Sequence, residues 1–377
     1  MPMEIVNTGS KQSSLKPIPH PQKGLPKMRR LPIFLVIDVS ESMVGQPLRQ
    51  MQEGISRLID TLRRDPYALE TVYLSVIAFA GIAKTLAPLV ELVAFYPPRL
   101  PVGSGTSLGA ALNHVMDEIN QHVITNSPER KGDYKPVVYL MTDGGATDNP
   151  AAAIARWQRD FAHRANLVAI GIGPFADLAQ LAPISHGVLR LDTNNEADFK
   201  AFIDWISQSV SSQSRSLGVD MPVSLDKGEQ PFLTLVKDLE QAAAVDENYV
   251  IISGLCSKTK LPYLVKYERA PMMTDVPFFT KQQTAQVFSY AGVFPVEADY
   301  KDWSDPRVNT QTISTASLMG GGGCPHCGAS SALCQCGNCG QTFCANAYDT
   351  TITCPNCQRQ LTMSSEGGDF DVSRARG

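Results

Sequence analysis

Polar side chains that suit a hard divalent cation stand in three short stretches of the 377-residue sequence. These stretches read Asp-Val-Ser-Glu-Ser at 38–42, Gly-Thr-Ser at 105–107 and Thr-Asp-Gly at 142–144. Mg²⁺ prefers oxygen ligands in an octahedral shell and keeps several waters, so a few hydroxyls and two carboxylates suffice. The candidate ligands are Asp38, Ser40, Ser42, Thr106 and Asp143. We expect the hydroxyls to bind the cation directly and the carboxylates to bind it directly or through water, leaving one position that a carboxylate from another molecule can complete.

Cysteines near the end of the chain form a second set of candidate ligands. Of the nine cysteines, eight lie between 324 and 357, and three pairs have the spacing Cys-x-x-Cys. Such pairs aim two thiolates at one tetrahedral metal ion, so eight thiolates are enough for two closed zinc sites. The expected zinc ligands are Cys324, Cys327, Cys334, Cys336, Cys339, Cys344, Cys354 and Cys357. The pairing stays open: either the outer two pairs share one zinc and the other four cysteines a second, or one thiolate is spare.

Two further residues near these ligands are expected to bind no metal. Cys256 lies in strand-like sequence, where a lone thiol usually packs as a small apolar side chain. His326 stands between the cysteines of one pair and is expected to be exposed. A segment of about 40 residues with few large apolar side chains cannot close a core unaided, so the zinc is expected to be structural.

Alternating strands and helices must bring the three polar stretches together. Residues 33–37 form a continuous apolar run, as in a strand buried on both faces, and residues 48–62 have apolar side chains at helical spacing. The alternation continues to residue 212 and predicts an α/β fold with a doubly wound, mostly parallel sheet covered by helices on both faces. In such a sheet ligands bind at the carboxyl ends of strands, where Asp38 and Asp143 stand, so we expect the stretches to converge.

Composition divides the rest of the chain into segments. We expect a flexible basic arm at 1–30, the α/β domain at 31–212, a linker at 213–230, a small β-rich domain at 231–319, a cysteine-rich zinc module at 320–363 and a disordered tail at 364–377. The β-rich region is predicted from two strand-like runs, 249–254 and 262–267, joined by a Ser-Lys-Thr-Lys turn.

The three polar stretches, in the sequences DVSES, GSGTSLG and MTDGGATD, resemble the metal-ion-dependent adhesion site (MIDAS) of von Willebrand A domains. This resemblance covers about residues 31–212. It implies that the five candidate ligands hold Mg²⁺ or another divalent cation. It also implies that an Asp or Glu of a protein partner completes the coordination.

A closer resemblance follows from the sequence KGDYKP before the MTDG strand, from DWIS at 204–207 and from the cysteine-rich end. Together they are similar to the TerY type of bacterial tellurium-resistance proteins. This resemblance implies a role in chemical-stress response, with a serine/threonine protein kinase and a metal-dependent protein phosphatase as partners. The stretch at 145–148 departs from the family pattern in having no proline before its Thr-Asp pair, which leaves the ligands unchanged.

The whole sequence favours a binding protein over an enzyme. Its formal charge of −4 gives no general attraction to nucleic acid, and its apolar runs are shorter than the ~20 residues that span a bilayer. With no signal-like amino terminus, reduced thiols and a cytoplasmic location are expected. No histidine lies in a recognisable catalytic motif. We therefore predict a non-catalytic, cation-dependent adaptor. The alternatives are a nucleic-acid-associated protein that uses the zinc module and a metal-dependent hydrolase.

Overall fold

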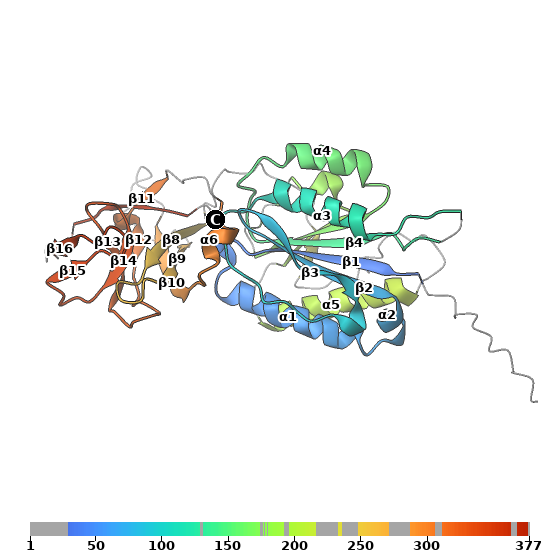
Figure 1. Ribbon diagram of the computed structural model, residues 1–377, viewed down its shortest axis with the longest axis horizontal. Helices are drawn as coiled ribbons and strands as arrows, with labels where there is room; N and C mark the ends of the chain where they lie inside the picture. Colours follow the sequence, from blue (N-terminus) through green and yellow to red (C-terminus); the bar gives the residue numbers. More distant parts are fainter. Residues whose placement is uncertain are drawn as a thin grey trace, which may run out of the picture.

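The computed structural model describes residues 29–128, 131–173, 176, 178, 180–191, 196–215, 233–235, 248–270, 287–305, 311–362 and 368–375. These residues form two domains that lie end to end along the longest axis of the molecule (Figure 1). The first domain is built around a seven-stranded sheet, and the second around a six-stranded sheet.

The sheet of the first domain has the order β3-β2-β1-β4-β5-β6-β7. Its strands are β1 (Leu31–Asp38), β2 (Val72–Phe79), β3 (Ala83–Glu91), β4 (Val137–Thr142), β5 (Asn166–Ile172), β6 (Gly187–Leu191) and β7 (Leu233–Leu235). The five inner strands are parallel, and an antiparallel strand closes each edge. All residues of β1, β4 and β5 are buried, as the continuous apolar runs predict for strands covered on both faces.

Helices cover both faces of this sheet (Figure 1). One face packs α1 (Gln46–Leu62), α2 (Pro66–Thr71) and α5 (Glu196–Arg215), and the other packs α3 (Leu108–His122) and α4 (Ala151–Asp160). Three 3-10 turns complete the domain: η1 (Glu41–Met43), η2 (Leu92–Ala94) and η3 (Ala182–Ile184). The predicted doubly wound α/β fold is confirmed.

The chain first adds strands on one side of β1 and then on the other side, so the strand order changes direction between β1 and β4. From β1 it adds β2 and β3 on one side, then returns through α3 to add β4 on the other side. Asp38 ends β1, and Asp143 follows β4, so both carboxylates stand at the switch point between these neighbouring strands. This is the place where open α/β sheets bind ligands.

In the residues that the structure describes, the second domain is a β-structure with one short α-helix. Its six-stranded sheet has the order β12-β10-β9-β8-β14-β13, and two small two-stranded sheets join β11 with β17 and β15 with β16. The elements are β8 (Tyr249–Leu255), β9 (Pro262–Arg269), β10 (Phe288–Pro295), α6 (Tyr300–Trp303), β11 (Thr312–Ser314), η4 (Thr315–Ser317), β12 (Leu318–Met319), β13 (Ser331–Gln335), β14 (Thr342–Ala345), β15 (Thr351–Thr353), β16 (Gln360–Thr362) and β17 (Asp371–Ser373).

The predicted border between a β-rich domain and a cysteine module at 319/320 is wrong. Strand β14, from the cysteine-rich stretch, pairs in parallel with β8, from the β-rich stretch. Both stretches therefore share one sheet and one apolar core, which includes Val250, Tyr267 and Ala332. Since the zinc module alone has few large apolar side chains, this shared core supplies what it lacks.

Three other predicted borders also shift. Helix α5 runs past 212 to Arg215, whose guanidinium binds Asp65 at 2.7 Å. Strand β7, predicted to belong to the β-rich domain, instead pairs with β6 of the first domain. The predicted disordered tail contains β17, and Val372 within it is fully buried. Each segment is fixed by a pairing with a distant part of the chain, which local composition does not reveal.

The predicted basic arm at 1–30 lies mostly outside the described residues. Its last two residues bind the first domain: Arg30 forms an ion pair with Asp133, and Arg29 donates to the carbonyl of Gly132 at 2.8 Å. The described residues therefore include the last two of the predicted arm, and both contact the first domain.

Candidate metal centres

The first polar stretch folds back on itself directly after β1. The Asp38 carboxylate accepts a hydrogen bond from the backbone N–H of Ser40 at 2.9 Å. The hydroxyls of Ser40 and Ser42 lie 3.0 Å apart. This turn therefore gathers one carboxylate and two hydroxyls, all oxygen groups that suit a hard cation.

The other two stretches join the first through hydrogen bonds. The Ser42 hydroxyl donates to Asp143 at 2.8 Å, and the Thr142 hydroxyl donates to the second oxygen of Asp38. The backbone N–H of Thr106 donates to the Thr147 hydroxyl at 2.8 Å, and the Thr147 N–H donates to the Thr106 carbonyl at 2.9 Å. The three loops that the sequence predicted to converge thus lie together at the carboxyl end of the sheet.

All five candidate ligands are buried, with exposures from 0% for Asp38 to 4% for Asp143. Two carboxylates in one poorly hydrated cluster repel each other, and a bound cation removes that cost. Hydroxyls with two carboxylates also match the ligand preference of Mg²⁺. The residues present therefore fit a divalent cation.

Two acidic residues beside the cluster have structural partners. Glu41 accepts hydrogen bonds from the hydroxyls of Ser104, at 2.9 Å, and Tyr300. Burial and the Glu41 charge raise the pKa of Tyr300 well above its usual value, so its hydroxyl keeps the proton that it donates. Asp148 accepts from the backbone N–H groups of Gly109 and Ala110, at 3.1 and 3.2 Å, in the first turn of α3. Both carboxylates thus hold loops in place.

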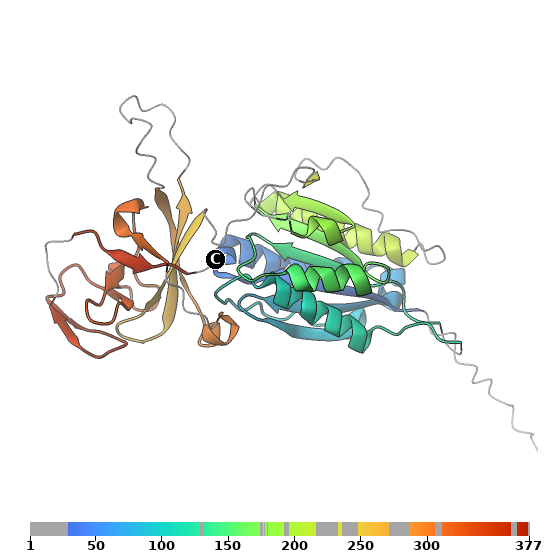
Figure 2. The same ribbon diagram turned by 90° about the horizontal axis from the view of Figure 1, so that it is seen from above.

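The second domain rests directly on these loops. The Lys266 ammonium donates to the carbonyl of Ser42 at 2.6 Å, and the backbone N–H of Asp305 donates to the carbonyl of Ser104 at 2.8 Å. Apolar contacts accompany them, because Val44 packs with Ile251, Leu264 and other side chains of the second domain. Figure 2 shows the narrow junction, with the short helix α6 beside it.

Four loops of the second domain have the same hydrogen-bonded shape. Each begins with a cysteine whose N–H donates to the carbonyl five residues later, at 2.8–2.9 Å, and whose carbonyl accepts from the N–H four residues later, at 2.8–3.1 Å. The residue four positions after the cysteine has a positive φ of 59–72°. These loops begin at Cys256, Cys324, Cys336 and Cys354. Three of them are the Cys-x-x-Cys pairs, and the fourth has Thr259 in place of the second cysteine.

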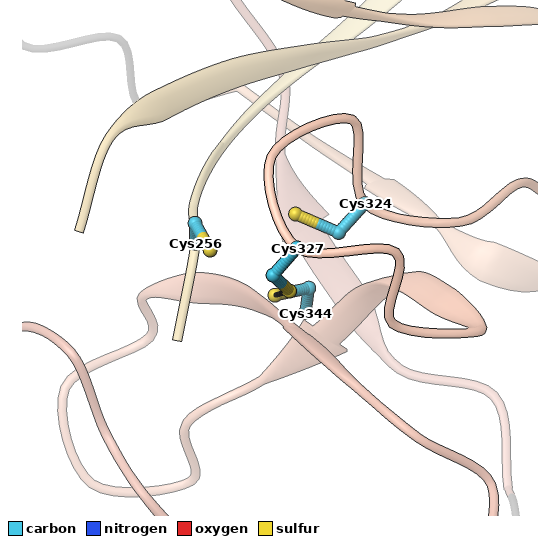
Figure 3. Close-up of side chains that lie close together, drawn as sticks. All are labelled: Cys256, Cys324, Cys327 and Cys344. Atoms are coloured by element: carbon cyan, nitrogen blue, oxygen red, sulfur yellow. Dashed lines mark hydrogen bonds between the residues drawn. The ribbon is translucent and has the colours of Figure 1, made fainter. Parts of the chain in front are cut away.

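The fourth loop explains the first group of thiols. Cys256, Cys324, Cys327 and Cys344 have all their sulfur atoms within 4.8 Å of one another (Figure 3). Because the loop at Cys256 contributes one thiol where the others contribute two, Cys344 from β14 supplies the fourth. The Cys327 and Cys344 sulfurs lie 3.7 Å apart. Two thiolates of a tetrahedral zinc site, at about 2.3 Å from the metal, are separated by about 3.8 Å.

The second group consists of the last two Cys-x-x-Cys pairs, with Cys336, Cys339, Cys354 and Cys357. Their sulfurs form two cross-contacts of 3.7 Å, between Cys336 and Cys357 and between Cys339 and Cys354. This spacing again fits tetrahedral zinc and is far longer than a disulfide bond of about 2.05 Å. All nine cysteines are free thiols.

These groups correct the predicted zinc ligands. Cys334 lies outside both groups, Cys256 belongs to the first, and the outer two Cys-x-x-Cys pairs do not share a metal. The reason is the alternation of side chains along a strand. Phe343 of β14 is the register partner of Cys334 and packs with the second group, so the next residue, Cys344, points to the opposite face. The His326 Nε2–H donates to the Pro262 carbonyl at 2.8 Å, and His326 belongs to neither thiol group.

Hydrogen bonds prepare part of each group for a metal. Burial opposes ionisation of Cys256, yet hydrogen bonds from Thr259 and the neighbouring backbone lower the pKa of its thiol to about 6. A backbone N–H at Arg359 and the side chain of Asn338 lower the pKa of Cys357 to about 6. Burial raises the pKa of Cys324 to about 12, so that thiol needs a metal ion to lose its proton at neutral pH. Each group contains four thiols, which is enough to fill all four positions around a tetrahedral ion. The arrangement therefore suits structural zinc.

Comparison with known families agrees with both parts of this description. Residues 33–202 match the von Willebrand factor type A domain, and residues 246–377 match the TerY-C metal binding domain. The chain is therefore a von Willebrand A (vWA) protein with a cysteine-ligated metal-binding domain behind it. This order of domains matches the arrangement of TerY-type proteins, with a vWA domain followed by a C-terminal metal-binding domain.

Similar solved structures come from several organisms. Proximal thread matrix protein 1 from the mussel byssus, with a zinc-occupied MIDAS motif, is 19% identical, with 48% of each chain covered and a TM-score of 0.35. BatB from Bacteroides thetaiotaomicron is 22% identical, covering 49% of this chain and 100% of its own, with a TM-score of 0.34. The pilus adhesin SpaC from Lactobacillus rhamnosus GG, in its open conformation, is 12% identical, covering 65% and 33%, with a TM-score of 0.40.

This chain thus spans about half the length of the byssus proteins that it matches. No curated protein matches it. Among the described residues, no helix is both long and apolar enough to cross a membrane.

Proposed function

We propose that this protein is a non-catalytic adaptor that binds a partner protein through a divalent cation. The observation that carries the proposal is the convergence of three loops that bury two carboxylates and three hydroxyls at the switch point of the sheet. The proposed ligands of the cation are Asp38, Ser40, Ser42, Thr106 and Asp143. Mg²⁺ suits these oxygen groups and tolerates an incomplete protein shell.

The partner is proposed to supply an Asp or Glu to the cation. A carboxylate that reaches the cation enters a poorly hydrated cluster, where charges interact more strongly than at a surface. Such a bond gives both affinity and a requirement for the metal. The zinc-bound second domain is proposed to have a structural role.

The resemblance to TerY proteins supports a place in a chemical-stress pathway of the tellurium-resistance kind. The proposed partners are a serine/threonine kinase and a protein phosphatase, and the proposed compartment is the cytoplasm. A carboxylate-bearing surface of one of these proteins would then dock at the cation.

A pull-down from cell extract, with the full chain as bait, tests the proposal. We expect partners to be retained in Mg²⁺ and released by EDTA, and to be lost from an Asp38→Ala bait. An Asp160→Ala bait is the matched control, because Asp160 is exposed and pairs with its neighbour Arg159 far from the loops. Partners that stay bound in EDTA, or that bind the Asp38→Ala bait normally, contradict a cation-dependent adaptor.

A further inference from the structure

The segment from Tyr300 to Asp305 of the second domain forms hydrogen bonds with the loop that carries Thr106. The Ser104 N–H donates to the Ser304 hydroxyl at 2.9 Å, and the Ser104 carbonyl accepts from the Asp305 N–H at 2.8 Å. One residue of the loop is thus held at both of its backbone polar groups. Thr106, two residues further on, is a proposed cation ligand.

The same segment packs closely against Gly81 and Gly103 of the first domain. The Gly81 N–H donates to the Trp303 carbonyl at 3.0 Å, and a Cβ on Gly81 would lie 1.9 Å from the Asp305 nitrogen. A Cβ on Gly103 would lie 2.6 Å from the Cβ of Trp303. The Trp303 side chain itself is 6% exposed and belongs to the core of the first domain. These contacts show a packed joint rather than a loose apposition of two domains.

The second domain also forms hydrogen bonds with the loop that carries Ser40 and Ser42. Lys266 is 3% exposed, its ammonium donates to the Ser42 carbonyl at 2.6 Å, and it lies 4.5 Å from the centre of the Tyr249 ring. Tyr300 binds Glu41, the residue between the two serines. The backbone of two of the three cation-site loops is therefore fixed by the second domain.

We propose that the second domain is a positioning element of the cation site, so that cation binding and docking of the two domains strengthen each other. The inference rests on the proposed function only in requiring that the five ligands bind a cation. A loop that is already held in the binding geometry loses less conformational entropy when the cation arrives. By linkage, a cation that binds the docked form more tightly must in turn stabilise the docking by the same factor.

Calorimetric titration with Mn²⁺ tests whether the second domain raises the affinity of the cation site, with Ser304→Ala and Trp303→Ala as variants. Neither residue is a proposed cation ligand. We expect the affinity for Mn²⁺ to fall about fivefold or more in each variant. Ser314→Ala is the matched control, because that serine accepts the N–H of Ala316 elsewhere in the second domain. Variants that bind Mn²⁺ as tightly as the unchanged protein overturn the positioning role.

The docking side is tested by hydrogen exchange of the amides that cross the joint, those of Gly81 and Asp305. We expect Mg²⁺ to slow both, while the Asp349 amide, bonded within the second domain to Asn346, exchanges unchanged. Cation binding without slower exchange at the joint contradicts the linkage but leaves the adaptor proposal standing. Failure of the unchanged protein to bind any divalent cation removes both.

An independent observation concerns a cavity at the opposite end of the first domain, where β4 and β5 begin. The cavity has a volume of about 630 Å³. Its basic lining residues are Arg29, Lys135, His163, Arg164 and His186. Asp133, an acid among the described lining residues, forms an ion pair with Arg30 and accepts a hydrogen bond from the backbone N–H of Ile124 at 2.8 Å. Positive charge therefore dominates this cavity.

Part of this charge is held in place before any ligand arrives. The Arg29 guanidinium donates to two backbone carbonyls at 2.8 and 2.9 Å and lies 4.1 Å above the Tyr134 ring. The Arg164 guanidinium lies 4.9 Å from the Phe161 ring. Burial and the nearby Lys135 charge lower the pKa of His186, so at neutral pH this imidazole is a hydrogen-bonding group with little charge. A fixed arginine suits a planar or tetrahedral oxyanion.

We infer that this cavity binds a phosphate group, either free or as a monoester. Its volume lies in the range of sites for small ligands. Calorimetric titrations with inorganic phosphate and with O-phosphoserine test the inference and separate the two sources. We expect saturable binding of at least one, weakened about tenfold in Arg164→Gln and Lys135→Gln. Arg159→Gln is the matched control, since Arg159, near the end of α4, pairs with Asp160 outside the cavity. Absence of saturable binding, or equal binding by the Arg164 and Lys135 variants, overturns the site.

Discussion

At the scale of single residues, the first zinc group depends on which cysteine supplies the thiol that the loop at Cys256 lacks. The loop at Cys256 has the backbone hydrogen bonds of the three Cys-x-x-Cys loops but carries Thr259 at the second cysteine position. Cys344 completes that group, and Cys334, which the sequence made an equal candidate, does not. The Cys-x-x-Thr-Lys stretch was a usable signal, because a fourth copy of the loop needs only its first cysteine and a residue that adopts a positive φ.

The two cysteines should therefore behave differently when each is changed to serine. We expect Cys256→Ser to lose one of two zinc ions per chain, because three thiolates hold a structural zinc poorly. Cys334→Ser should keep both ions. Elemental analysis of the purified variants measures the difference. Full zinc content in Cys256→Ser, or loss of zinc from Cys334→Ser, would contradict the assignment.

At the scale of elements, the strand runs and helical spacing predicted the first domain because each local signal agrees with the fold. The convergence of Asp38 and Asp143 followed from one rule about the carboxyl ends of parallel strands. The rest depends on pairings between distant segments. Strand β7 is three residues long, and it is a strand because it pairs with β6. In the same way, β17 is a strand because it pairs with β11. Local composition carries no record of such partners.

Asp65 provides a test of how one element is fixed. It accepts the N–H of Tyr67 at the start of α2 and binds Arg215 at the end of α5. Burial opposes ionisation, but the hydrogen bond from Arg215 and the helix cap lower the pKa of Asp65 below its usual value. The stabilisation is therefore present above the unfolded pKa of about 4 and is lost as pH falls through the lower folded pKa.

We expect Asp65→Ala to lower the free energy of unfolding of the first domain by about 1–2 kcal/mol at neutral pH. The difference from the unchanged protein should shrink below about pH 4. Urea unfolding at several pH values measures both, with the exposed Asp60→Ala as control. A loss of stability that is the same at pH 3 and pH 7 would contradict the role of the ionised carboxylate.

At the scale of the whole molecule, the two domains meet at the cation site. Local sequence could not show this, because Lys266, Tyr300 and Asp305 reach the loops from another domain, far away in the sequence. The site is consequently both the proposed docking surface for a partner and the joint of the molecule. Its central requirement is that the gathered oxygen groups bind a divalent cation.

Calorimetric titration of the full chain with Mg²⁺, beside an Asp143→Ala variant, tests that requirement most directly. We predict one saturable Mg²⁺ site per chain and an affinity at least tenfold weaker in the variant. The fold should survive in the variant, because removing one of two close carboxylates relieves repulsion in the absence of metal. Unchanged Mg²⁺ affinity in Asp143→Ala, with the melting temperature preserved, would contradict the assignment of these loops as the cation site.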